Sequence, residues 1–234
     1  MKYRAVFFDV GGTLMRMDRE HVAQKYVALA RARHITIDPE IALRTFSTLD
    51  DEIPARARAA PPLSLDERAG EIFWKALFAD GWSRLGLEKN DEAINQLYHD
   101  FRRGDFNRLF DDVLPALAAL QKRNLTMGVV TNFTANCQDV LHTLGVAKYF
   151  PNGHIIVSAI VGAEKPARKI FDYATRSVKY PGNEIVYVGD GVHSDVEGAH
   201  GAGWDAILLD RDNWYPDYNT VPRIRSLIEL ANLI

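Results

Sequence analysis

The chain has 234 residues, 47% of them hydrophobic and 25% charged, which is ordinary for a globular protein with one large domain or one domain plus an inserted module. Its formal net charge of −3 gives no indication of nucleic acid or an anionic membrane as a partner. The apolar run before Asp9 is too short for a signal peptide, and no stretch approaches the ~20 apolar residues that cross a bilayer, so we expect a cytoplasmic protein.

The first predicted elements are a strand at residues 5–8 and, after it, a long segment without strands. Between residues 16 and 105 the apolar spacing predicts four helices, at 20–33, 39–49, 65–78 and 91–102. A stretch rich in Ala, Arg and Pro at 53–62, which includes Arg56 and Arg58, is predicted to be a loop. We expect the helical insert, residues 16–105, to form a separate cap domain with hinges near residues 15–18 and 104–110.

From residue 106 onward, strands and helices alternate. Strands are predicted at 127–130, 155–157, 185–188 and 206–209, and helices at 112–122, 135–144 and 166–178. The spacing of Ser194 and Glu197 is typical of a capping box that opens another helix, and the apolar spacing of 224–231 predicts a C-terminal helix. Such alternation implies crossover connections and an α/β core, residues 1–15 plus 106–234, with a parallel sheet covered on both faces.

Polar side chains stand at the ends of these strands. Asp9 ends the first strand, Thr131 and Asn132 follow the second, and Asp190 follows the strand at 185–188. Ligands bind at the carboxyl edge of open α/β sheets, where a carboxylate can act as a covalent nucleophile. Two acids from separate strands can hold Mg²⁺, and a hydroxyl with exposed backbone amides can hold a phosphoryl group. Lys165, before Pro166 at a predicted helix start, can neutralise negative charge at the reacting centre.

In their order along the chain these residues resemble the motifs of the haloacid dehalogenase (HAD)-like hydrolase superfamily, in its branch with a helical cap inserted after the first strand. The resemblance covers nearly the whole chain. It implies a Rossmann-like open sheet and a phosphatase that acts on a small phosphorylated metabolite through an aspartyl phosphate, with Mg²⁺ as cofactor. The oligomeric state stays open.

The resemblance also implies roles for individual residues. Asp9 would be the nucleophile and a Mg²⁺ ligand, with the Gly11 carbonyl and Asp190 as further ligands. Thr131 and the Asn132 amide would bind the phosphoryl oxygens, and Lys165 would bridge nucleophile and phosphate. Asp195 would support the metal shell or the lysine.

The sequence departs from the family pattern at Gly11, where phosphatases usually carry a second aspartate as general acid and base. Because such proton transfer typically contributes about 10²–10⁴-fold, simple alkyl phosphates are expected to be poor substrates. Three possibilities stay open for a protein that lacks this acid. The leaving group could be an acyl or aryl oxygen that needs little protonation, the proton could come from another residue such as His193 or a cap residue, or the reaction could be a different one.

Family members without the second acid include 2-haloacid dehalogenases and phosphonoacetaldehyde hydrolases. The first is disfavoured, because Asp190 with the preceding glycine resembles a metal-binding motif and dehalogenation needs no metal. The second needs a cap lysine that forms a Schiff base, for which Lys25, Lys75 and Lys89 are available. The single cysteine, Cys137, excludes an internal disulfide, favours a reducing compartment and is expected to serve packing.

Two further classes compete with a HAD-like hydrolase. Residues 9–13 also resemble the phosphate loop of actin-like sugar kinases, but a helical insert follows them and the chain looks short for two nucleotide-binding lobes. The other is a catalytically weak HAD-like binding or regulatory protein, whose catalysis decayed with the second acid; the retained Asp9, Lys165 and Asp190 argue against full decay.

Overall fold

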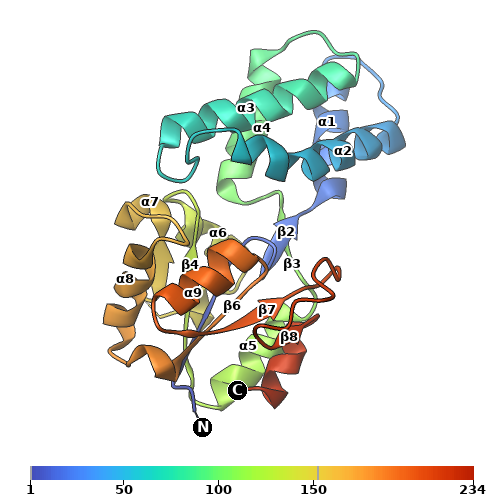
Figure 1. The fold of residues 1–234 in the computed structure, drawn as a ribbon. Helices are drawn as coiled ribbons and strands as arrows, with labels where there is room; N and C mark the ends of the chain where they lie inside the picture. The colour runs from blue at the N-terminus through green and yellow to red at the C-terminus, as the bar shows by residue number, and fades with distance from the viewer. Residues whose placement is uncertain (1, 152) are drawn as a thin grey trace. The chain divides into compact units, whose positions relative to one another are not determined.

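The computed structural model describes residues 2–151 and 153–234. The chain divides into two compact units, a sheet unit of Met1–Arg16 with Leu109–Ile234 and a helical unit of Met17–Arg108 (Figure 1). The sequence predicted the insert at residues 16–105. In the structure the helical unit begins one residue later and ends three residues later. Within the described ranges, none of the helices combines the length and the apolar character needed to cross a membrane.

The sheet unit is built on a parallel sheet in the strand order β5-β4-β1-β6-β7-β8. This confirms the predicted α/β fold with its open parallel sheet. The strands are β1 (Ala5–Phe8), β4 (Thr126–Thr131), β5 (Ile155–Val157), β6 (Ile185–Gly189), β7 (Asp205–Leu209) and β8 (Arg223–Ile224). The first five were predicted, whereas β8 has two residues and shows no period in the sequence.

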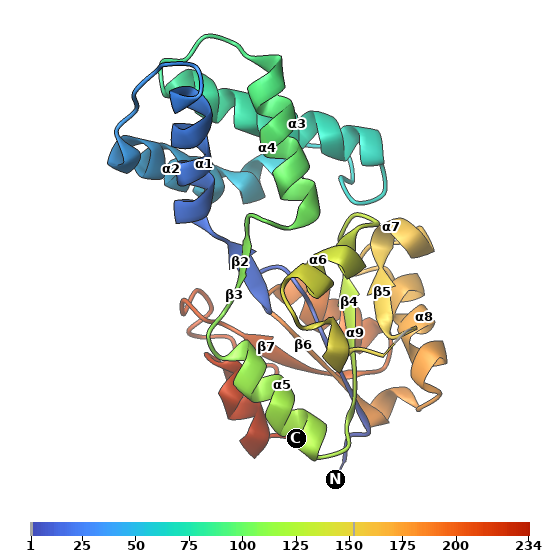
Figure 2. The same ribbon diagram turned by 180° about the vertical axis from the view of Figure 1, so that it is seen from behind.

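Helices cover both faces of this sheet (Figures 1 and 2). They are α5 (Val113–Lys122), α6 (Cys137–Thr143), α7 (Ser158–Val161), α8 (Arg168–Val178) and α9 (Gly198–Gly201), with the short turns η1 (Ala147–Tyr149), η2 (Gly182–Glu184), η3 (Val192–Glu197) and η4 (Leu227–Asn232). Because side chains alternate along a strand, Val6 and Phe8 pack with α5 and α6, while Ala5 and Phe7 pack with α8 and α9.

Two predicted features of the sheet unit are wrong. Ser194 does not open a helix as a capping box, because it lies inside the π-helical turn η3. The Glu197 carboxylate instead lies 2.6 Å from the His193 ring. The capping box is found at Ser226 and Glu229, at the start of the 3₁₀ helix η4. The predicted helix at 224–231 is thus a two-residue strand followed by this short helix.

The helical unit contains α1 (Arg19–Arg31), α2 (Pro39–Arg58), α3 (Glu67–Arg84) and α4 (Asp91–Arg103). Each begins at an Asp or Asn whose side chain accepts a hydrogen bond from a backbone N–H of the first turn, as N-cap residues do. Buried aromatic side chains form its core: Tyr26, Phe46, Phe78, Trp82 and Phe106.

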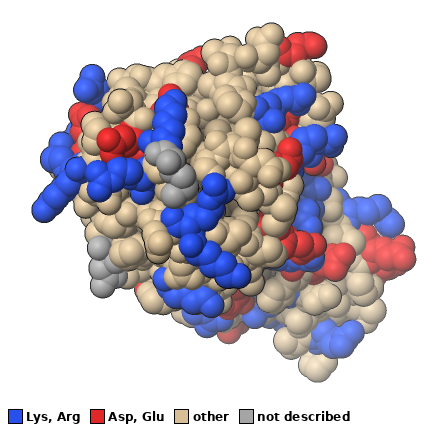
Figure 3. All heavy atoms as spheres, turned by 90° about the horizontal axis from the view of Figure 1, so that it is seen from below, with Lys and Arg blue, Asp and Glu red and all other residues tan. Residues whose placement is uncertain are grey.

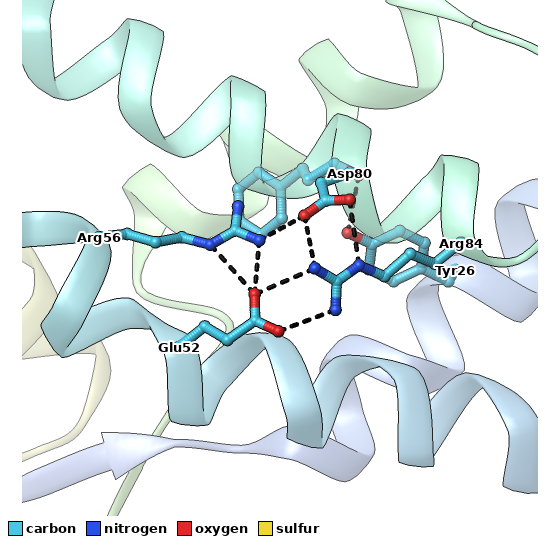
Figure 4. A network of polar contacts seen from close by, with 6 residues as sticks. Tyr26, Glu52, Arg56, Asp80 and Arg84 are labelled. Atoms are coloured by element: carbon cyan, nitrogen blue, oxygen red, sulfur yellow. Dashed lines mark hydrogen bonds and ion pairs between the residues drawn. The ribbon is translucent and has the colours of Figure 1, made fainter.

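Helix α2 runs nine residues beyond its predicted end at residue 49 and passes through Pro54. An ion-pair network joins this last part of α2 to α3 (Figure 4). Glu52 accepts hydrogen bonds from Arg56, at 2.5 Å, and from Arg84, at 3.0 Å, and both arginines also bind Asp80. The tertiary contacts therefore extend the helix where composition predicted a loop, and Arg56 belongs to a helix-to-helix network.

The chain crosses between the units through β2 (Met15–Met17) and β3 (Asn107–Leu109), which form a two-stranded sheet. Three residues are too few for a sequence period, so these strands were not predicted.

Lys and Arg side chains are spread over the face shown in Figure 3, with Asp and Glu among them. This mixture agrees with the small net charge of −3.

Candidate active site

Asp9 directly follows β1, a central strand of the sheet. Its backbone N–H donates to the Val188 carbonyl at 2.9 Å, and Phe8 is in register with Val129 of β4 and Val188 of β6. The parallel register therefore brings the carboxyl ends of β4 and β6 to either side of Asp9. This is the edge at which open α/β sheets bind ligands.

Lys165 lies in the centre of the site, with 2% of its side chain exposed. Its Nζ donates to Asp9 Oδ1 at 2.8 Å, to Asp195 Oδ1 at 2.6 Å and to Tyr187 Oη at 2.9 Å. Tyr187 Oη in turn donates to the Val130 carbonyl at 2.6 Å, which leaves its lone pairs for the lysine. The three N–H donors of the ammonium group are therefore satisfied by three acceptors.

Sequence reasoning missed Tyr187. The only signal available was a hydroxyl-bearing ring in the middle of a strand whose other members are aliphatic or glycine, buried throughout. Buried tyrosine hydroxyls usually find a partner, so a search for one would have pointed toward the lysine.

The electrostatics of the site follow from burial and from the excess of acids. Burial would lower the pKa of Lys165, but the carboxylates of Asp195 and Asp9 raise it above its ordinary value. Burial raises the pKa of Asp9, against the lowering effect of Lys165. Burial, with Asp9 and Asp195 nearby, raises the pKa of Asp190 to about 7. One lysine thus lies among three carboxyl groups, and a bound cation would offset the excess negative charge.

Asp9, Asp190 and Asp195 each offer a carboxylate oxygen, and these oxygens lie within 4.8 Å of one another. All three donors are hard oxygen ligands on a partly exposed edge, which is the ligand type that Mg²⁺ prefers. The residues present therefore fit a divalent cation. Both oxygens of Asp195 already have partners: Oδ1 the Lys165 ammonium and Oδ2 the Gly191 N–H, at 2.8 Å.

The turn after Asp9 packs against Asp190. Gly12 has φ +74°, and a Cβ there would lie 2.3 Å from Asp190 Oδ2, so only glycine fits. Thr13 is fully buried and its hydroxyl donates to Asp190 Oδ1 at 3.3 Å. At Gly11, by contrast, a Cβ would meet no described atom within 4 Å. A side chain could therefore be accommodated where the family's second aspartate is missing.

Thr131 ends β4 and is 2% exposed, and the Asn132 side chain turns to the lysine segment. Asn132 Oδ1 accepts from the Lys165 N–H at 2.7 Å, and its Nδ2 donates to the Lys165 carbonyl at 3.1 Å. The Asn132 amide group thus holds the backbone that carries the lysine, a role the sequence did not suggest. Thr131 does not cap the helix that follows, because α6 begins after Asn136.

The sequence also drew attention to His193 and Cys137. The His193 ring pairs with Glu197, and 78% of its side chain is exposed. Burial raises the pKa of the Cys137 thiol to about 12, so this cysteine is a packing residue.

The three lysines considered for a Schiff base are each engaged in an ion pair within the helical unit. The pairs are Lys25 with Asp100 at 2.6 Å, Lys75 with Glu71 at 2.5 Å, and Lys89 with Asp91 at 3.2 Å. To form a Schiff base, each of these lysines would have to leave its carboxylate partner.

Comparison with known proteins agrees with this geometry. The family model described as haloacid dehalogenase-like hydrolase matches residues 3–203. The chain is 31% identical over 162 residues to a glyceraldehyde 3-phosphate phosphatase of Methanopyrus kandleri, covering 63% of this chain and 68% of that protein. It is 26% identical to an N-acetylmuramic acid 6-phosphate phosphatase of Pseudomonas putida, covering 94% and 88%. The solved structure of the HAD-hydrolase YfnB of Bacillus subtilis, 22% identical, superimposes with a TM-score of 0.71 over 100% of this chain and 99% of that chain.

Proposed function

Since this chain belongs to the haloacid dehalogenase-like hydrolases, we propose that it is a Mg²⁺-dependent phosphatase of small phosphorylated metabolites. The observation that carries the proposal is the Lys165 ammonium, buried between Asp9 and Asp195 beside a third carboxyl group, Asp190. A nucleophilic carboxylate with an adjacent fixed cation suits attack on a phosphoryl group. The names of the two phosphatase relatives support the same reaction class.

In the first step Asp9 attacks phosphorus. A bond forms between a carboxylate oxygen of Asp9 and phosphorus while the bond between phosphorus and the leaving oxygen breaks, which gives an aspartyl phosphate and the leaving group as an anion that takes its proton from solvent. In the second step water attacks phosphorus and loses a proton to solvent, while the bond between phosphorus and the Asp9 oxygen breaks, which releases inorganic phosphate and restores the Asp9 carboxylate. Bound at Asp9, Asp190 and the Gly11 carbonyl, Mg²⁺ would supply positive charge to the phosphoryl oxygens.

The remaining residues position the phosphoryl group and neutralise its negative charge. Lys165, kept protonated by Asp195 and Asp9, balances the charge that collects on the phosphoryl oxygens. Thr131 and the backbone amide of Asn132 bind those oxygens, while the Asn132 side chain fixes the lysine segment. Asp195 supports both the lysine and the metal shell. The helical unit serves as the cap that selects the substrate.

Gly11 narrows the substrate class within this proposal. Without an acid at this position, a leaving oxygen that is already acidic departs more readily than an alkoxide. Acyl and aryl phosphates are therefore expected to be cleaved faster than alkyl phosphates. The lysine ion pairs of the helical unit give no support to the phosphonatase alternative.

The proposal is tested by phosphate release from p-nitrophenyl phosphate, with and without MgCl₂, after subtraction of an Asp9→Asn background. We expect release that depends on both Asp9 and the metal and that stops with a chelator. Halide release from a 2-haloacid in the presence of chelator, with no phosphate release, would instead establish a dehalogenase. Folded protein with neither activity, including carbon–phosphorus cleavage, would indicate a binding role.

A further inference from the structure

Arg211, two residues after β7, hydrogen-bonds to the turn that follows Asp9. Its Nη2 donates to the Thr13 carbonyl at 2.8 Å. Its Nη1 and Nη2 also donate to the two oxygens of Asp112, at 2.8 and 3.0 Å. The guanidinium carbon lies 3.9 Å from the ring centre of Phe110, and only 14% of the side chain is exposed. One planar cation thus joins three segments that are far apart in the sequence.

The Asp112 end of this contact is itself firmly held. Asp112 Oδ2 accepts further hydrogen bonds from the Ser226 hydroxyl and the Leu227 N–H, both at 2.8 Å. Asp112 also precedes α5, which packs on η4. A carboxylate with this many donors has little freedom to move, so the arginine that it binds is fixed as well.

The other end of the contact leads to Asp190. Gly12 and Thr13 are adjacent residues of the turn, the first leaving room for the Asp190 carboxylate and the second donating its hydroxyl to it. Thr13 therefore makes two hydrogen bonds: its carbonyl accepts from Arg211, and its hydroxyl donates to Asp190. Displacement of the carbonyl would move the hydroxyl and the Gly12 backbone away from the carboxylate.

We propose that Arg211 is a positioning residue for Asp190: by tying the Thr13 carbonyl to Asp112, it holds the Asp190 carboxylate in its metal-binding place. This inference rests on the proposed function, in which Asp190 is a Mg²⁺ ligand. Residues that orient metal ligands typically change metal affinity or activity by about 10–100-fold when they are replaced.

The test compares Arg211→Lys with Arg223→Lys. Lysine keeps the charge but cannot bridge Asp112 and the Thr13 carbonyl with a planar fork. Arg223 is a matched control, because it also binds a buried aspartate, Asp210, at 2.7 Å, while its other side-chain hydrogen bond within residues 2–151 and 153–234 goes to Asn213 and not to the turn. Mn²⁺ serves as the probe, and free Mn²⁺ is measured by electron paramagnetic resonance with no substrate present. Thr13→Val removes the hydroxyl on Asp190 directly.

We expect the dissociation constant for Mn²⁺ to rise about tenfold in Arg211→Lys and in Thr13→Val, and to stay at the wild-type value in Arg223→Lys. Equal affinities in the two arginine variants, with wild-type binding intact, would overturn the role of Arg211 and leave the proposed function standing. A wild-type protein that binds no Mn²⁺ would overturn both. The thermal stability of each variant is measured alongside, so that a general loss of structure is recognised.

Discussion

The ion pairs around Lys165 in the sheet unit and those around Glu52 in the helical unit differ in burial. In the sheet unit, Lys165 and Asp195 are each 2% exposed, and every donor of the ammonium group has an acceptor. In the helical unit, the network of Glu52, Arg56, Asp80 and Arg84 is about a third exposed and joins α2 to α3. Removing charges from water is costly, whereas exposed pairs contribute little. The buried pair is where we propose that the chemistry takes place, and the more exposed network joins two helices.

The largest effect is expected from Lys165→Met. This change leaves the buried carboxylates of Asp9 and Asp195 without their cation, which should lower the free energy of unfolding by about 3–5 kcal/mol. Phosphate release should be lost as well. Hydrogen exchange of the β6 amides in increasing urea, with chelator present, measures the change within the sheet unit. Unchanged protection would mean that the pair is dispensable to the fold.

Gly12→Ala should disrupt the site more than the neighbouring Gly11→Ala. At Gly12 the new Cβ would meet Asp190 Oδ2 at 2.3 Å, and the left-handed backbone alone costs about 1–2 kcal/mol for a residue with a side chain. At Gly11 the space is open among the described atoms. Thermal unfolding and Mn²⁺ binding of both variants measure the difference. Equal behaviour would show that the turn does not pack on Asp190 as described.

Gly11→Asp should increase the turnover of alkyl phosphates, by up to about 10²-fold, because it supplies the proton donor that the sequence lacks. Aryl phosphates, whose leaving groups need little protonation, should gain much less. The ratio of the two rates, measured under the same Mg²⁺ concentration, is the quantity of interest. If the folded variant turns over alkyl phosphates no faster than the wild-type protein, the missing acid does not limit their turnover.

Tyr187→Phe removes the third acceptor of Lys165 and the hydrogen bond that the tyrosine hydroxyl donates to the Val130 carbonyl. One such hydrogen bond contributes about 0.5–1.5 kcal/mol, so turnover should fall by about two- to tenfold while KM stays near its original value. Tyr173→Phe, on the exposed face of α8, is the control. A shift in KM alone would argue that Tyr187 does not act through the lysine.

Arg56→Gln in the helical unit should have the smallest effect. Its partners are partly exposed, and salt screens such pairs. We expect a small drop in thermal stability that shrinks further in 1 M NaCl, and unchanged Mn²⁺ binding. A loss as large as that of Lys165→Met would remove the contrast between the units.

Much of the sheet unit could be predicted from the sequence, because its central strands are short apolar runs buried on both faces. Elements of two or three residues, such as β2, β3 and β8, carry no period and were missed. The capping box at Ser194 failed because Asp195 and Glu197 have tertiary and local partners that the spacing does not reveal. The extension of α2 past Pro54 depends on contacts with α3 in the same way.

The members of the candidate site follow from strand ends, since parallel strands bring Asp9, Thr131 and Asp190 to one edge. The contacts that hold them could not be read in advance. The Asn132 side chain on the lysine backbone, Tyr187 on the ammonium group and Arg211 on the turn each depend on register and on approaches between distant segments.

The central claim, that Asp9 carries the phosphoryl group, is tested most directly by trapping the intermediate. The wild-type protein and Asp9→Asn are mixed with ³²P-labelled acetyl phosphate and MgCl₂, quenched in acid and digested, and the labelled peptide is identified. We predict an acid-stable, alkali-labile label on the peptide that contains Asp9 and none in the variant. Phosphate release by the wild-type protein with no label on that peptide, or with label on another residue, would contradict the account.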